Sequence, residues 1–84
     1  MIHQLNETKM ISLSTKLAIG FKFEVTTKNG FKLVGNRNRQ FLVTLENDLY
    51  NVHAFNLKGI NLVNEKKVNG IFANQLNQAI RELV

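Results

Sequence analysis

The sequence contains no cysteine, no proline and no tryptophan. Without cysteine, the chain can form no disulfide and offers no thiolate to a metal ion. The two histidines, His3 and His53, lie far apart in the sequence, and no group of histidines and carboxylates has the spacing of a metal site. We therefore expect no metal and no cofactor. Because proline is absent, turns must be made by glycine and asparagine.

Long apolar runs are also missing. No segment approaches the roughly 18–20 apolar residues that a membrane-spanning helix needs. Residues 1–20 lack the charged start and continuous apolar stretch of an export signal. We expect a cytoplasmic protein, and the 84 residues are enough for a single domain spanning 1–84.

Catalytic patterns are equally scarce. Asp48 is the only aspartate, and with its neighbour Glu46 it is typical of a turn. His53 lies among apolar residues with no serine or aspartate beside it in the sequence. The five glycines form no phosphate-binding motif. The sequence predicts no catalytic residues, and we expect a protein that is not an enzyme.

The first half of the chain predicts a helix followed by a hairpin. Met10, Leu13 and Leu17 have helical spacing within residues 8–19, and Gly20 is typical of a helix C-terminal cap. A period of two also fits part of this segment, so a strand remains an alternative. Residues 21–35 alternate apolar and polar side chains around a turn, which is typical of a β-hairpin.

The alternation also favours one hairpin register. A three-residue loop at 28–30, with Gly30 in the left-handed region, would pair Val25 with Leu33 and Thr27 with Phe31. All five large apolar residues would then share the buried face, whereas a two-residue loop at 29–30 would place Lys32 there. The three-residue loop is therefore the prediction.

The second half predicts further strands and a final helix. Residues 41–45 and 49–57 have strand composition, and the second is apolar on both faces, as in a central strand. A shorter fifth strand is expected at 60–63, fading into charged residues. A helix from 71 to the end carries one apolar stripe: Phe72, Leu76, Ala79, Ile80 and Leu83.

Together these segments predict an α+β fold. It has an N-terminal helix, an antiparallel meander sheet of four to five strands, and a C-terminal helix packed on one face. Short connections between consecutive strands exclude parallel pairing.

The positive charge of the chain is concentrated in one segment. The formal net charge is +5, and residues 16–39 account for all of it, with six cations against Glu24 alone. Such a patch attracts phosphates or acidic proteins, although lysines on a strand can also serve only solubility. The predicted partner-binding residues are Lys22, Lys28, Lys32, Arg37 and Arg39.

The second half also resembles a family of small phage- and prophage-encoded proteins. The resemblance is carried by residues 48–52 (DLYNV) and 68–76 (VNGIFANQL). Asn51 and Asn74 stand where the family often has aspartate, and the usual Thr-Gly-Leu tail is missing. The resemblance implies a mobile-element origin without implying an activity. The residues that match the family pattern are Asp48, Tyr50, Gly70, Phe72 and Gln75.

Three functional hypotheses follow. The first is an accessory protein that binds and modulates a host protein, for example as an anti-CRISPR-type inhibitor of bacterial immunity. The second is a nucleic-acid-binding protein that uses the basic hairpin 16–39. The third is a virion or assembly component that acts as a homo-oligomer, since an exposed strand edge can pair two copies.

Overall fold

The computed structural model describes residues 11–84. In this part of the chain the elements follow one another as α2 (Leu13–Ile19), β1 (Phe23–Thr27), β2 (Gly30–Val34), the 3₁₀ helix η1 (Asn36–Asn38), β3 (Arg39–Glu46), β4 (Leu49–Lys58), β5 (Asn61–Ile71), the 3₁₀ helix η2 (Ala73–Gln75) and α3 (Leu76–Glu82).

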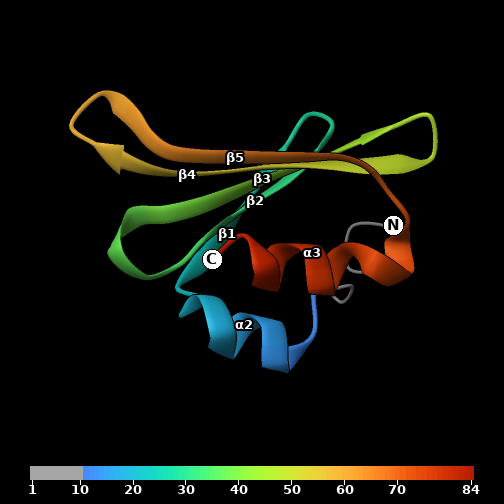
Figure 1. Ribbon diagram of the computed structural model, residues 1–84, viewed down its shortest axis with the longest axis horizontal. Coiled ribbons are helices and arrows are strands. Elements are labelled where there is room, and N and C mark those ends of the chain that lie inside the picture. Colours follow the sequence, from blue (N-terminus) through green and yellow to red (C-terminus); the bar gives the residue numbers. More distant parts are fainter. Residues whose placement is uncertain (1–10) are drawn as a thin grey trace.

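The strands form one antiparallel sheet in the order β1-β2-β3-β4-β5, so every neighbour in space is also a neighbour in sequence. Figure 1 shows α2 and α3 on the same side of this sheet. The predicted α+β class, the meander and the two terminal helices are therefore confirmed. Neither helix in residues 11–84 is long and apolar enough to cross a membrane.

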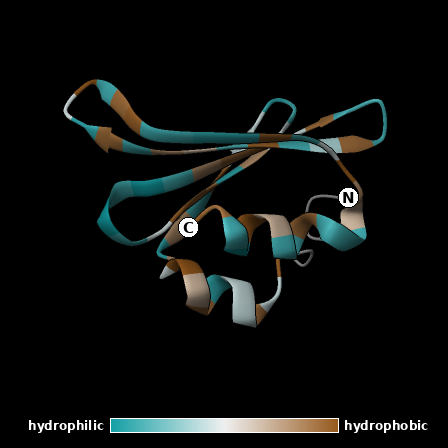
Figure 2. Ribbon diagram, in the orientation of Figure 1, coloured by the Kyte–Doolittle hydropathy of each residue, from teal (hydrophilic) through white to brown (hydrophobic). Residues whose placement is uncertain are grey.

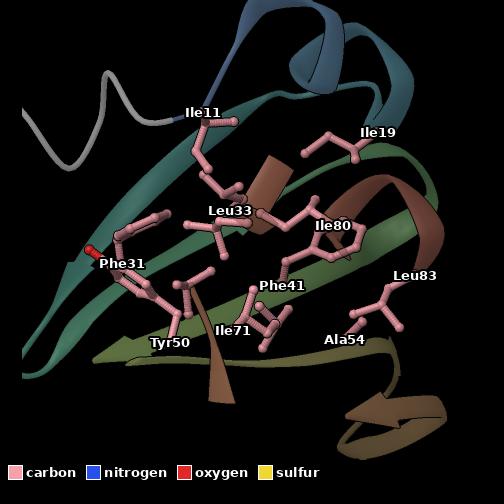
Figure 3. Close-up of a cluster of buried hydrophobic side chains, with 13 residues drawn as sticks. Ile11, Ile19, Phe31, Leu33, Phe41, Tyr50, Ala54, Ile71, Ile80 and Leu83 are labelled. Atoms are coloured by element: carbon pink, nitrogen blue, oxygen red, sulfur yellow. The ribbon is translucent and has the colours of Figure 1, made fainter. Parts of the chain in front are cut away.

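The hydrophobic core lies between the sheet and the two helices (Figure 3). Alternate residues of the inner strands point into it, because side chains along a strand alternate between the two faces. Phe31 and Leu33 of β2 lie opposite Val43 and Phe41 of β3, and all four are almost completely buried. The core therefore forms around the central strands, and the helices close it from one side.

The C-terminal helix matches its predicted stripe in part. Leu76, Ile80 and Leu83 are buried against the sheet, and Ala79 packs beside them. The predicted start at residue 71 is wrong, because β5 continues to Ile71 and α3 begins at Leu76. Phe72, predicted to join the stripe, is exposed in the link between these elements.

The N-terminal helix has a different buried face from the predicted one. Leu13 and Leu17 are 72% and 73% exposed, whereas Thr15 and Ile19 are buried. Met10 and the start of the predicted helix at residue 8 lie outside the described residues. Leu13 and Leu17 therefore lie on the solvent side of α2. The predicted cap is confirmed, since Gly20 adopts the left-handed conformation that ends the helix.

Both hairpin registers considered from the sequence are wrong. Thr27 pairs with Gly30 around a two-residue turn, Lys28–Asn29, so Val25 lies opposite Lys32 and Glu24 opposite Leu33. Gly30 is not left-handed. Glycine is needed there because a Cβ atom would lie 2.1 Å from the Val43 carbonyl oxygen of β3.

The correct register separates the five large apolar residues of the hairpin. Phe31 and Leu33 face the helices, and Phe21 packs at the edge of the core. Phe23 and Val25 point to the opposite face of the sheet and are well exposed. The assumption that every large apolar residue must face one core caused the error.

The fifth strand is longer than predicted. β5 runs for 11 residues along β4, with two irregularities in register. Figure 2 shows it hydrophilic over most of its length, which explains why composition did not reveal it. Pairing with β4, rather than apolar content, holds this strand in place.

A pair of leucine substitutions tests this assignment of faces. Leu33→Ala removes a side chain that is fully buried, so the free energy of unfolding should fall by about 2–5 kcal/mol. Leu13→Ala should change it by less than about 0.5 kcal/mol, since that side chain is exposed. Urea denaturation followed by circular dichroism measures both. Equal losses for the two variants would contradict the assignment.

Candidate functional site

The five predicted basic residues occupy different environments. Lys22 and Lys28 are exposed, before β1 and in the β1–β2 turn, and Lys32 is half-buried in the middle of β2. Arg37 is exposed in η1. Arg39 begins β3 and is only 8% exposed. The structure therefore spreads these cations along the hairpin and beyond its end.

Arg39 is held by hydrogen bonds from its guanidinium to several parts of the chain. Its Nε and one terminal nitrogen donate to the Leu83 carbonyl oxygen at 3.1 and 2.5 Å. The other terminal nitrogen donates to the Asn56 Oδ1 at 2.9 Å and the Asn64 carbonyl oxygen at 2.7 Å. Burial lowers the pKa of the Arg39 guanidinium, but arginine remains charged at physiological pH. This cation thus ties the end of α3 to β4 and β5.

Arg39 also lines a pocket of about 580 Å³ between the C-terminal end of α2, η1 and the β4–β5 pair. Its cationic residues are Arg37, Arg39 and Lys66, and no carboxylate side chain belongs to its lining. We call this the basic pocket. Its full lining is Ala18, Ile19, Asn36, Arg37, Arg39, Asn56, Asn64, Lys66 and Val84.

Arg37, which lines the basic pocket, has an unusual backbone conformation. Arg37 and Asn38 have φ values of 58° and 59°, a conformation that costs a residue other than glycine roughly 1–2 kcal/mol. The Asn56 side chain holds this turn, because its Nδ2 donates to the Arg37 carbonyl oxygen at 2.9 Å. Backbone strain of this kind is common at binding sites, where it fixes the direction of a functional side chain.

A close approach of α2 to the sheet brings the end of this helix to the basic pocket. A Cβ atom on Gly35 would lie 2.2 Å from the Ile19 carbonyl oxygen. Only glycine at 35 therefore allows the end of α2 to lie against the end of β2. This contact brings Ala18 and Ile19 into the lining of the basic pocket, which also contains Arg37 and Lys66, two cations without an ion pair among residues 11–84.

Sequence reasoning missed Lys66, Asn56 and Asn64 as members of this site. Lys66 lies in a segment whose formal charges cancel, next to Glu65. Alternation along β5 places these neighbours on different faces of the sheet. Lys66 lies opposite Ala54 on the helix side, and Glu65 contacts His53 on the other side. The fifth strand was predicted only at 60–63, so the sequence analysis assigned no face to either residue.

The second candidate site is the sheet face that the described helices leave uncovered. Strand alternation and register assign its residues in rows across the strands. Phe23, Val34, Gln40 and Phe55 form one row. The open face is defined by these four together with the next row, Val25, Lys32, Leu42, His53 and Lys67.

The open face carries apolar side chains of its own. Val34 and Phe55 are buried, yet they are not part of the core cluster between sheet and helices. Phe23 is 53% exposed beside them, and Val25 is also exposed. His53 packs against Phe55 with ring centroids 5.1 Å apart, and its Nε2 lies 2.8 Å from the Glu65 Oε1. Phe23 and Val25 are thus the exposed apolar side chains of a small second cluster, beside the buried Val34 and Phe55.

The residues of the family pattern gather at one end of the sheet. Asp48 lies in the β3–β4 turn with φ 66°, and Tyr50 of the core pairs with Ile71. The Gly70 N–H donates to Asn51 Oδ1 at 3.1 Å. Gln75 Oε1 accepts from the Phe72 N–H at 3.3 Å. These contacts join the start of β4 to the end of β5 and to η2, which is a structural role.

Residues 11–84 contain no group of three or more histidine, aspartate or glutamate side chains arranged to hold a metal ion. Comparisons of the chain with protein-family models, with curated proteins and with solved structures found no match. The functional argument therefore rests on the geometry of the two candidate sites.

Two arginine substitutions test whether the buried Arg39 stabilises the fold and the exposed Arg37 does not. Arg39→Met leaves the Leu83 and Asn64 carbonyl oxygens without their donor, so the free energy of unfolding should fall by about 2–5 kcal/mol. Arg37→Gln should change it by less than about 0.5 kcal/mol. Thermal and urea unfolding measure the pair. A stable Arg39→Met protein would show that the buried guanidinium does not hold the fold together.

Proposed function

We propose that this protein works by binding, not by catalysis, and that it docks on a partner protein through the open face. The observation that carries the proposal is the pair of exposed apolar side chains Phe23 and Val25, with the half-buried Leu42 in the same row as Val25, on a sheet face that no described helix covers. Exposed apolar groups gathered on one surface are typical of interaction sites.

The charges on the open face indicate the chemistry of the partner. Lys32 lies in the middle of the apolar rows and Lys67 at their β5 end. Glu65, two residues before Lys67 in β5, is paired with His53. The whole chain carries a formal net charge of +5. A partner surface with apolar side chains and carboxylates placed opposite Lys32 and Lys67 fits this pattern.

The aromatic residues of the open face favour a protein over a nucleic acid. Single-stranded nucleic acid binds to sheets through several exposed rings on which successive bases stack. Here Phe55 is buried and Phe23 is the well-exposed phenylalanine of the face. The exposed cations Lys28 and Arg37 lie beyond opposite ends of β2, in the β1–β2 turn and in η1, so they do not form one track.

The free strand edges favour docking on the face over strand addition. Among the described strands, β1 and β5 have one neighbour each. β1 is only five residues long. β5 carries Lys66 and Lys67, and Asn64 within it has φ 55°. Short length, lysines and backbone irregularities are features that protect edges from pairing.

The proposal that the partner belongs to a bacterial host, in whose cytoplasm the protein acts, rests on the resemblance of residues 48–76 to phage and prophage proteins. Modulation of a host protein, with inhibition of bacterial immunity as one version, is the role that this origin suggests. The open face supplies a surface for such a complex.

A matched pair of phenylalanine variants tests the proposal. Phe23→Ser should weaken binding to the purified partner, identified by affinity capture and mass spectrometry, by at least about tenfold because it removes an anchor from the open face. Phe72→Ser removes an equally exposed ring away from that face and should leave the dissociation constant within about twofold. Isothermal titration calorimetry measures both.

Three results would overturn the proposal. Equal effects of the two substitutions would exclude the open face as the binding surface. Capture that disappears after nuclease treatment would show that nucleic acid is the ligand. A dimer mass in solution that Phe23→Ser converts to a monomer would show that a second copy of the chain covers the face.

A further inference from the structure

The basic pocket is independent of the open face and has the character of a ligand site. It lies on the helix side of the sheet, where Arg39 and Lys66 point, whereas Phe23 and Lys32 belong to the other side. Its volume of about 580 Å³ falls within the roughly 300–1,000 Å³ typical of small-molecule sites.

The electrostatics of the pocket favour an anion. Three cationic side chains line it, Arg37, Arg39 and Lys66, and the main-chain carboxylate of Val84, the last residue, is the one anionic group in this lining. The Arg39 guanidinium donates to carbonyl and amide oxygens, which are neutral. No carboxylate among these partners neutralises its positive charge. Arg37 and Lys66 make no ion pair within the described residues. Two uncommitted cations beside a third, fixed one are suited to a group with more than one negative charge.

The backbone around Arg37 supports the same conclusion. Two consecutive left-handed residues, Arg37 and Asn38, are kept in place by the Asn56 amide. Asn56 is itself held by Arg39. The buried cation therefore positions, through one asparagine, the turn that carries the exposed cation. Such preorganisation lowers the entropy that Arg37 loses when it binds a ligand.

The apolar part of the pocket lining indicates what the ligand contains besides an anionic group. Ala18 and Val84 line the pocket with exposed apolar side chains, and the close contact between Ile19 and Gly35 fixes the end of α2 that carries Ala18. An inorganic phosphate ion between the cations would leave these apolar side chains without a contact. A molecule that combines an anionic group with an apolar body uses both parts of the lining.

We propose that the basic pocket binds a phosphate monoester of a small organic molecule. The phosphoryl group lies between Arg37 and Lys66, in the field of Arg39, and the organic portion packs on Ala18 and Val84. Arginine is suited to this task because its planar guanidinium donates two parallel hydrogen bonds to phosphate oxygens. Nucleic acids also carry phosphoryl groups, as diesters along the backbone. The probes below distinguish a small phosphate monoester from a nucleic acid.

The test uses three probes at constant ionic strength with the full chain. Phenyl phosphate supplies a monoester with an apolar body, inorganic phosphate lacks the body, and a short oligothymidylate without terminal phosphates supplies only diesters. Phenyl phosphate should bind with 1:1 stoichiometry and at least about threefold more tightly than inorganic phosphate, since burial of the ring adds apolar contact. NMR titration should shift the backbone amides of Asn36, Arg37 and Asn64.

Charge-matched variants locate the site. Arg37→Gln and Lys66→Gln should each weaken phenyl phosphate binding by about tenfold, because each removes a charge-assisted contact. Lys28→Gln is the control, since it removes the same charge from the β1–β2 turn at the far end of the hairpin. It should change the dissociation constant by less than about twofold.

Several outcomes would overturn the proposal. Binding of phenyl phosphate that does not saturate below about 10 mM would correspond to a negligible affinity. An equal loss in Lys28→Gln and Arg37→Gln would show a diffuse positive field instead of a pocket. Tighter binding of oligothymidylate than of phenyl phosphate would assign the cations to nucleic acid.

Discussion

The buried guanidinium of Arg39 joins parts of the chain that are far apart in sequence. It binds the Leu83 carbonyl oxygen at the end of α3, the Asn56 side chain of β4 and the Asn64 carbonyl oxygen of β5. An unpaired carbonyl in such a place would lose its hydrogen bond to water without replacement. One side chain therefore satisfies the end of the last helix and fixes that helix on the sheet. Through Asn56 it also holds the turn at Arg37.

The same contact explains why two helices of seven residues suffice to close the core. Isolated helices of that length are unstable in water, so their stability must come from contacts with the rest of the chain. α3 is anchored at its end by Arg39. α2 is tied to α3 by hydrogen bonds from the Ser12 N–H to Asn77 Oδ1 and from Arg81 to Thr15 Oγ1. These links place the helices on one side and leave the opposite sheet face uncovered by residues 11–84.

Local signals in the sequence predicted the elements better than their faces. The stripe of Leu76, Ile80 and Leu83 identified α3 because these residues pack on a single core. Leu13 and Leu17 had an equally good spacing and proved exposed, because Thr15 turns inward to accept from Arg81. The hairpin register failed for a related reason. It depended on Gly30 approaching the Val43 carbonyl of β3, a contact that no pattern within residues 21–35 contains.

The candidate sites show the same limit. Clustering of charge in residues 16–39 identified Arg37 and Arg39, but sequence proximity cannot distinguish a buried cation from an exposed one. Lys66 was missed because the formal charges of residues 40–84 sum to zero, and because the fifth strand was predicted only at 60–63, so no face was assigned to Lys66 or Glu65. Clustered charges in the sequence therefore indicate where the electrostatic field of the protein is positive. The basic pocket, in contrast, depends on how residues far apart in the sequence are brought together.

The two candidate sites share strand β4, whose alternating side chains belong to opposite faces. Asn56 holds the turn at the basic pocket, while its neighbour Phe55 belongs to the apolar cluster of the open face. Substitutions at Phe23 and Arg37 act on different sides of the sheet and share none of the contacts described for these residues. Effects of well-separated substitutions that share no partner are generally additive. Loss of binding in one site with retention in the other would thus assign each ligand to its own surface, because a change that unfolded the protein would remove both.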